Sequence, residues 1–421
     1  MPAQPYGVNV LDQSGLTPPA REVAGAVPFV VGTAPGTGTA GVNEPVLLRS
    51  FSDYEAAFGV PADGDANAYT LAAAAAVLFK LYRVQPVVFV NVYDADVAVH
   101  DGDTANVAAA DVAGSDDGAG TRTGLQTADE VFTAFGVVPS LFLAPGYATD
   151  QAVRDALRAK AASHTGYFRG LALLDLDGAN AAAGIAAKAT AGPGGAALDD
   201  PFAVACWPAV KRLTGTADGA PVYEADPMSL HVAGAIAREA AANDGVPLRS
   251  PSNTPLLAAE LAVTLTLQEV RAVRDAGVVT AQRFGPGGYR FAGNRTSAFA
   301  AGEPTADSAE AVARDSFVPG RLVANYVANA IVLDTLALTD GPITRAQVDR
   351  VLDAANRRGN ALVGAGASLG FRAAFLPEDN PAGDLADGRV TYRLAFLPAT
   401  PMERADFLLD VDLGFFGALF A

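Results

Sequence analysis

The side chains best suited to catalysis or metal binding are scarce in this 421-residue chain. There are three histidines, His100, His164 and His231, and one cysteine, Cys206. A single cysteine excludes an intramolecular disulfide and any cysteine-rich zinc site. His100 and His164 stand alone in polar stretches and are predicted to be exposed, whereas Cys206 lies in an apolar run and is predicted to be a core residue. We therefore expect no catalytic residue, no bound metal and no cofactor.

Two glycine- and aspartate-rich loops have the superficial look of ligand sites. The loop 32–38 follows an apolar run, but it lacks the Gly-Lys-Ser/Thr ending of a nucleotide-binding loop, and Pro35 removes one amide donor. The segment 63–67 (DGDAN) starts like a calcium loop, yet Ala68 and Ala74 replace the required glycine and glutamate. The loop 32–38 is predicted to be a plain turn, and 63–67 lacks the bend and the bidentate ligand that a calcium loop needs.

The segment around His231 resembles part of the subtilisin family. His231-Val-Ala-Gly-Ala-Ile-Ala is similar to the helix that follows the catalytic histidine, but His231 takes the place of the second, non-catalytic one. Met228, which cannot accept a proton, stands at the catalytic place, and no Gly-Thr-Ser-Met nucleophile turn follows. Without a base and a nucleophile the triad cannot operate, so an active serine protease is not expected.

Length and charge narrow the class of protein further. The chain carries 46 acidic and 29 basic residues, a net charge of −17, which argues against binding nucleic acid. Residues 1–25 lack the basic start and apolar core of a signal peptide. The apolar runs at 71–79 and 327–333 are too short to cross a bilayer, so no membrane insertion is expected.

Apolar runs of strand length alternate with helical patterns over the first two thirds of the chain. Alternation of this kind predicts a mainly parallel sheet covered by helices on both faces. Thr149 or Asp150, Asn180 and Thr344 are expected to cap helices. The predicted strands are 26–32, 86–93, 140–144, 170–176 and 201–208, and the predicted helices are 67–82, 150–162, 181–190, 227–243, 319–338 and 344–362.

The end of the chain changes to a period of two residues. In 389–397 the side chains of Val390, Tyr392, Leu394 and Phe396 share one face, and in 405–412 those of Phe407, Leu409 and Val411 do the same. Two amphipathic strands at a chain end have few strands left to pair with, so they must fold back or add to the sheet of another chain. The candidate residues for strand exchange between subunits are Tyr392, Leu394, Phe396, Phe407, Leu409 and Val411.

Segments spread in order along nearly the whole chain resemble the contractile-tail sheath family. One of them, Gly288–Thr296 (GYRFAGNRT), is similar to the family's Trp-Gly-x-Arg-Thr signature, with Ala292 where tryptophan is usual. The other similar segments are 28–35 (PFVVGTAP), 45–59 (PVLLRSFSDYEAAFG), 112–124 (VAGSDDGAGTRTG), 139–147 (PSLFLAPGY), 231–253, 360–366 (NALVGAG) and 380–412.

The resemblance implies an α/β and α+β multidomain fold with five parts. These are an N-terminal extended arm (1–22), an N-terminal α/β region (23–100), a subtilisin-like α/β middle domain without protease activity (101–285), a C-terminal α+β domain (286–385) and C-terminal strands forming an arm (386–421).

The resemblance also implies a function. Sheath subunits stack as hexameric rings around a tail tube and contract to drive it through a cell envelope. The implied partners are other copies of the chain, bound through both arms, the tail tube protein, and baseplate and tail terminator proteins. The implied location is a virion tail or contractile particle assembled in the host cytoplasm.

Two other interpretations remain open at this point. One is an α/β hydrolase-like enzyme with an unrecognised active site, and the other is a different self-assembling particle protein. The enzyme needs a site, whereas the sheath subunit needs exchangeable arms.

Overall fold

The computed structural model describes residues 25–61, 69–96, 99–217, 219–283, 285–300, 302–304 and 308–419. The predicted N-terminal arm (1–22) and the segment 63–67 lie outside these ranges.

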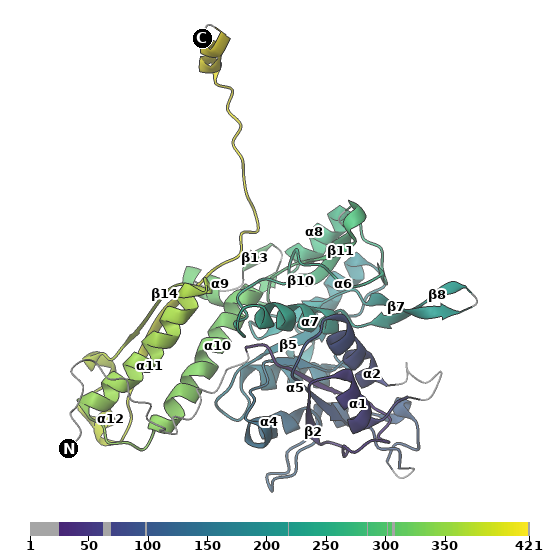
Figure 1. Ribbon diagram of the computed structural model, residues 1–421, viewed down its shortest axis with the longest axis horizontal. Coiled ribbons are helices and arrows are strands. Elements are labelled where there is room, and N and C mark those ends of the chain that lie inside the picture. The colour runs from purple at the N-terminus through teal and green to yellow at the C-terminus, as the bar shows by residue number, and fades with distance from the viewer. Residues whose placement is uncertain are drawn as a thin grey trace, which may run out of the picture.

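A mainly parallel sheet forms the centre of the described body (Figure 1). Six neighbouring strands are parallel, and the two outer strands, β11 and β2, run antiparallel to their neighbours. This arrangement confirms the predicted α/β sheet. The eight strands, in spatial order, are β11 (Tyr289–Ala292), β10 (Val278–Arg283), β6 (Ala203–Cys206), β5 (Leu171–Asp175), β4 (Leu141–Leu143), β1 (Pro28–Gly32), β3 (Val87–Asn91) and β2 (Pro45–Leu48).

Both faces of this sheet are buried because its strands are apolar at nearly every position. Along β3, Val87 and Phe89 enter one core cluster and Val88 and Val90 the other, as the two-residue period of a strand requires. The first cluster is closed by α1 (Phe51–Phe58), α2 (Thr70–Ala75), the π-helix η2 (Ala76–Leu81) and α7 (Met228–Ala241). The second is closed by α3 (Ala109–Ala113), α4 (Ala128–Phe135), α5 (Gln151–Ala162), α6 (Ala181–Lys188) and α8 (Leu267–Asp275).

Three predicted helix caps are present in the structure. The Asp150 carboxylate accepts the Ala152 amide at 2.8 Å, and the Asn180 side chain accepts the Ala183 amide at 3.0 Å. Thr344 caps α11 (Arg345–Gly364) by accepting the Gln347 amide at 3.2 Å. Each cap satisfies a backbone donor that the first turn of a helix leaves unpaired.

The stretches 23–100 and 101–285 contribute to the same sheet. β1 of the first stretch pairs with β4 of the second, with Phe29 opposite Phe142. The sheet therefore continues across residue 100 without an interruption of the hydrogen-bonded ladder.

A helical C-terminal part packs beside the sheet through α10 (Val318–Thr335). The Asn325 amide donates to the Gly170 carbonyl at 2.7 Å, and the Asn329 side chain bonds both the backbone N–H and the carbonyl of Arg169, each at 2.8 Å. Val318–Leu338 is long and apolar enough to cross a membrane, so the expectation that every apolar stretch is too short was wrong. Half of it is buried in the protein, and its buried asparagines bond the body, as in a core helix.

Around α10 the C-terminal part contains the long helix α11, two short helices and a two-stranded sheet. Its elements are α9 (Ala309–Asp315), α11, β14 (Ser368–Ala374), α12 (Ala382–Ala386) and β15 (Arg393–Pro398), and η9 (Leu413–Leu419) follows at the end. The remaining described strands form two smaller sheets. In one, β12 (Phe299–Ala300) pairs with β13 (Glu303–Pro304). In the other, β7 (Val210–Ala217) and β8 (Ala220–Asp226) form a hairpin, and β9 (Glu260–Leu261) pairs with the second edge of β7.

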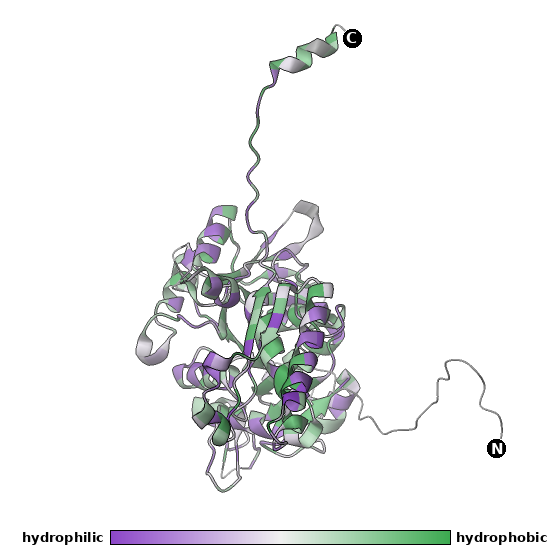
Figure 2. Ribbon diagram, turned by 90° about the vertical axis from the view of Figure 1, so that its left-hand side faces the viewer, coloured by the Kyte–Doolittle hydropathy of each residue, from purple (hydrophilic) through white to green (hydrophobic). Residues whose placement is uncertain are grey.

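The chain leaves the body after β15 as an extended segment that ends in η9. Figures 1 and 2 show this segment reaching far from the folded body, with only the turns of η9 at its tip. We call residues 404–419 the C-terminal arm. The strand predicted at 405–412 is absent within the single chain, because a strand forms only where its backbone groups have a partner, and the described arm lies against no other strand.

Candidate assembly site

The site predicted from sequence divides between the β14–β15 sheet and the C-terminal arm. β15 pairs antiparallel with β14 of the same chain, with Phe371 opposite Phe396. The first predicted strand thus has an intrachain partner along one edge, which the sequence did not reveal. No described strand pairs with the other edge of β15.

Tyr392, Leu394 and Phe396 share the inner face of this region, as their two-residue spacing predicted. All three are half-buried, while Arg393, Ala395 and Leu397 between them are exposed. The ring of Phe396 lies 6.4 Å from that of Phe371, and both pack on the small core formed by α10 and α11.

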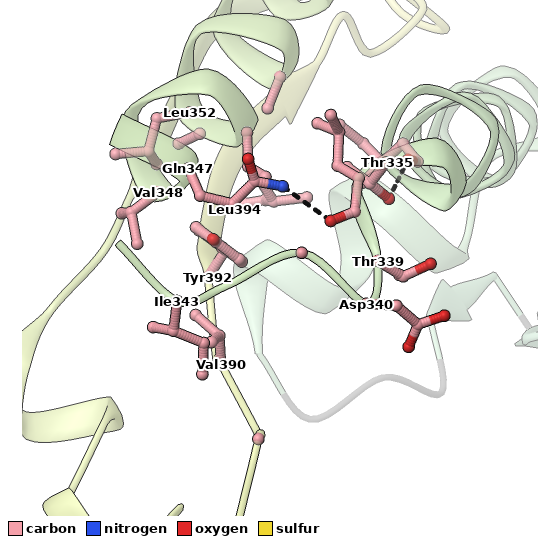
Figure 3. Close-up of a pocket in the computed structure, with 17 residues that line it drawn as sticks. Thr335, Thr339, Asp340, Ile343, Gln347, Val348, Leu352, Val390, Tyr392 and Leu394 are labelled. Atoms are coloured by element: carbon pink, nitrogen blue, oxygen red, sulfur yellow. Dashed lines mark hydrogen bonds between the residues drawn. The ribbon is translucent and has the colours of Figure 1, made fainter. Parts of the chain in front are cut away.

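A groove of about 590 Å³ lies beneath the segment that leads into β15 (Figure 3). Tyr392 and Leu394 line it together with Val390, facing α11 and the turn that follows α10. The Gln347 side chain donates to the Leu338 carbonyl at 2.7 Å and holds that turn against α11. Two of the predicted exchange residues therefore border an open and mostly apolar depression.

Phe407, Leu409 and Val411 lie on the arm, away from every described element. Their exposed fractions are 88%, 97% and 86%, against values near zero for apolar residues of the core. The same arm exposes further large apolar side chains, at Leu408, Leu413, Phe415, Phe416 and Leu419. A row of large exposed apolar side chains of this kind, outside the fold, is typical of an interaction site.

The arm is fixed to the body just before it begins. Arg295 pairs through two nitrogens with both carboxylate oxygens of Glu403, with Nε 3.1 Å from Oε1. The Arg295 guanidinium also stacks on the rings of Phe299 and Phe317, at 4.2 and 3.8 Å from their centroids. Arg295 belongs to the GNRT segment, so that motif helps to anchor the root of the arm.

The energetics favour association of the arm with a second surface. Burying Phe407, Leu409 and Val411 would contribute roughly 5–9 kcal/mol by apolar area, before the cost of ordering the arm. A strand edge with no described strand beside it, such as that of β15, is a place where a further strand can be added. The arrangement is suited to binding another polypeptide.

The three histidines and Cys206, all within the described ranges, do not converge on one site. His100 and His164 were predicted to be exposed, and this is wrong, because their exposed fractions are 5% and 1%. His100 stacks on Tyr93, and its Nδ1 lies 3.0 Å from the Asp94 backbone nitrogen. His164 packs on Phe142 and Phe168, and burial lowers its pKa to about 4.

His231 is fully buried on α7, where it packs against the base of the β7–β8 hairpin. Its Nδ1 lies 3.3 Å from the Tyr82 hydroxyl, and its Nε2 lies 3.6 Å from an Asp226 oxygen. Asp226 in turn accepts the Arg212 Nε–H at 2.7 Å. Burial lowers the pKa of His231, so the neutral imidazole is favoured. No serine hydroxyl of the described residues is bonded to it.

A buried serine–carboxylate pair, Ser229 with Asp175, also lies on this side of the sheet, and no histidine of the described residues is bonded to it. Ser229 donates both its amide and its hydroxyl to Asp175, at 2.9 and 2.5 Å, and burial raises the pKa of Asp175 to about 6. Cys206, predicted as a core residue, is fully buried in β6. Among the described residues no group of three or more His, Cys, Asp or Glu side chains is placed to hold a metal ion.

Two amides of the loop 32–38 donate to side chains of the protein itself. The Thr33 amide donates to the Thr70 hydroxyl at 3.1 Å, and the Ala34 amide donates to the Asn91 side chain at 2.9 Å. These donors are therefore not available to a phosphate.

An exposed apolar arm on a folded α/β body is typical of a structural protein that binds other chains. A tail sheath protein of Burkholderia phage BcepMu is 26% identical over 318 residues, which are 73% of this chain and 63% of the phage protein. A putative prophage major tail sheath protein of Pseudomonas aeruginosa UCBPP-PA14 is 28% identical over 380 residues, which are 88% of this chain and 86% of that protein. No protein-family model matches the chain.

The fold is also similar to that of solved sheath structures. The helical sheath of the anti-feeding prophage in its contracted state matches with a TM-score of 0.65 and 20% identity, covering 97% of this chain and 100% of that one. The chain is thus similar, over most of its length, to sheath proteins of contractile tails. Its relatives are structural sheath proteins and not enzymes, which agrees with the prediction that this chain is not an enzyme.

Proposed function

We propose that this chain is a sheath subunit that polymerises into stacked hexameric rings around a tail tube and contracts to drive the tube through a cell envelope. The observation that carries the proposal is the apolar C-terminal arm, which is almost fully exposed in the single chain. An exposed apolar segment at the end of a folded body is costly unless a partner covers it. The free edge of β15 gives such a partner a place to bind.

In this proposal the chain works as a body with two linkers. The N-terminal arm (1–22) and the strands and arm of 386–421 join neighbouring copies, and the regions 23–100, 101–285 and 286–385 form the body that rotates when the sheath contracts. Tyr392, Leu394 and Phe396 belong to the receiving sheet, and Phe407, Leu409 and Val411 belong to the incoming strand. The middle region has a subtilisin-like arrangement without its triad.

The proposal also assigns partners and a location. The polymer surrounds a tail tube protein and is bounded by baseplate and tail terminator proteins, in a virion tail or related particle assembled in the host cytoplasm. Main-chain hydrogen bonds in the exchanged strands would keep neighbouring subunits linked while their bodies repack.

Deleting the C-terminal arm tests this function. We expect the full chain to form tubes or rings in negative-stain images, and the chain ending at Glu403 to remain a folded monomer with an unchanged circular dichroism spectrum. Tubes of normal length from the shortened chain, or only compact monomers from the full chain at every salt and protein concentration, would contradict the proposal.

A further inference from the structure

A second groove, of about 490 Å³, lies where β15 and α9 meet the body. Its floor is largely apolar and includes Leu394 and Phe396 of β15, Phe202, and Val327 of α10. Three arginines also line it: Arg169, Arg314 and Arg321. Two of the residues predicted for strand exchange thus border a basic groove, in a chain whose net charge is −17.

One carboxylate serves two of these three guanidinium groups. Asp315 accepts Arg314 through both oxygens, at 2.8 and 2.6 Å, and also accepts Nη1 of Arg321 at 2.8 Å. Asp315 is the only acidic residue among those that line the groove. Three positive charges against one negative charge leave the groove short of anions.

The unbalanced positive charge of the groove costs free energy because one of its guanidinium groups, that of Arg321, is almost fully buried. Only 5% of its side chain is exposed, and its guanidinium lies 4.6 Å from the centroid of the Phe202 ring. Burial, together with the positive charges of Arg314 and Arg169, lowers the pKa of Arg321 to about 10, against the opposing effect of Asp315. A further carboxylate in the groove would offset this repulsion.

Arg169 is the guanidinium best placed to receive it. The backbone of Arg169 is held on both sides by Asn329, while its side chain is exposed and makes no ion pair with a described residue. Arg314 is also accessible, with half of its side chain exposed. Together they form a basic rim above the apolar floor.

The C-terminal arm has the complementary pattern. Phe407, Leu409 and Val411 alternate with Asp406, Leu408, Asp410 and Asp412. An extended arm therefore presents apolar side chains on one face, and three carboxylates together with Leu408 on the other. The arm of the same chain leads away from the body (Figure 1), so a neighbouring copy is the natural donor. Arginine binds carboxylates through paired hydrogen bonds, which would also fix the register of the strand.

We infer that the groove between β15 and the body is a carboxylate-binding site for the acidic C-terminal arm of a second copy, with Arg169 and Arg314 as its specificity-determining residues. The apolar face of the arm packs on the floor, and one or more of its aspartates pair with the rim. This inference rests on the proposed function, in which the arm binds another copy.

A double-mutant comparison in the full chain tests it. One variant carries Arg169→Gln and Arg314→Gln, another carries Asp406→Asn, Asp410→Asn and Asp412→Asn, and a third combines all five changes. Arg271→Gln on α8, an exposed arginine outside the groove, is the control. Each variant is first checked for an unchanged circular dichroism spectrum, and the critical concentration for polymerisation is then measured by sedimentation.

We expect the groove variant and the arm variant each to raise the critical concentration about tenfold, the factor that corresponds to one charge-assisted hydrogen bond. The combined variant should be little worse than either alone, because both remove the same interaction. The control should behave like the wild type.

Two results separate failure of this inference from failure of the function. If the chain ending at Glu403 still polymerises, the proposed function of the arm is wrong, and the inference falls with it. If that deletion abolishes polymerisation but the groove variant polymerises like the wild type, or the two sets of changes add fully, only the carboxylate site is overturned.

Discussion

Asp175 shows how burial sets the chemistry of a single residue in this fold. It is the last residue of β5, and its carboxylate accepts hydrogen bonds from the amide and the hydroxyl of Ser229. Burial raises its pKa from 3.8 to about 6. Since the folded protein binds this proton more tightly than the unfolded chain, the residue lowers stability as the pH rises from about 4 to 6, and the loss persists above 6.

Replacing Asp175 by Asn should remove this pH dependence. We expect the free energy of unfolding of Asp175→Asn, relative to the wild type, to rise by about 2–3 kcal/mol between pH 4 and pH 7. Urea unfolding at a series of pH values measures this difference. A difference that does not change with pH would show that Asp175 is ionised in the fold at the same pH as in the unfolded chain.

Thr344 offers a test of local stability at the start of α11. Thr344→Ala removes the acceptor for the Gln347 amide and should cost about 1 kcal/mol of unfolding free energy. Thr344→Ser keeps the acceptor and should cost much less. Equal losses for both substitutions in urea unfolding would mean that the hydroxyl does not cap the helix.

At the scale of elements, the arm is the part whose side chains should affect association between copies without affecting the folding of one copy. Phe407→Asp or Leu409→Asp should change the unfolding free energy by less than about 0.5 kcal/mol, since both side chains are exposed in the single chain. Either change should prevent polymerisation, because a carboxylate on the apolar face cannot be buried without a partner.

Leu322→Asp is the matched control for those two changes. Leu322 is buried on α10, so the same charge there should unfold the subunit. Urea unfolding and sedimentation distinguish the two kinds of effect. Unfolding of the subunit by Leu409→Asp would place residue 409 in the core of its own chain.

The elements that the sequence predicted well are those governed by local pattern. The buried strands β1, β3, β5 and β6 and the caps at Asp150, Asn180 and Thr344 follow from apolar runs and capping residues. The hairpin β7–β8 was missed, because it exposes both faces over most of its length and so has no apolar period. The hairpin is held together by pairing between its two strands, and this pairing leaves no recognisable pattern in a single sequence.

Parts of the candidate site depended on contacts distant in sequence. The alternation that predicted Leu394 and Phe396 as one face is local, but their pairing with β14 is not. The burial of His100 and His164 arises from aromatic neighbours brought together by folding. The basic groove unites Arg169 with Arg314, which are far apart in the chain, so no motif could have shown it.

At the scale of the whole molecule, net charge controls how copies approach one another. Each subunit carries −17, and copies packed in rings would repel one another strongly at low salt. The Debye length falls from about 30 Å at 0.01 M to about 8 Å at 0.15 M salt, whereas partly buried ion pairs are screened much less.

Raising the salt concentration over that range should therefore lower the critical concentration for polymerisation. Sedimentation at fixed protein concentrations across the salt series measures it, with the chain ending at Glu403 as a control that stays soluble throughout. A critical concentration that rises steadily with salt would mean that attraction between surface charges dominates assembly.

The central claim is that the arm of one copy binds the β15 region of another. The most direct measurement places a benzoylphenylalanine at position 407, mixes subunits labelled with ¹⁴N and ¹⁵N, and identifies the photo-crosslinked peptides by mass spectrometry. The account predicts mixed-isotope peptides that join the arm to β14, β15 or the groove residues of α9 and α10. Crosslinks found only within one isotope, joining the arm to its own chain, would contradict it.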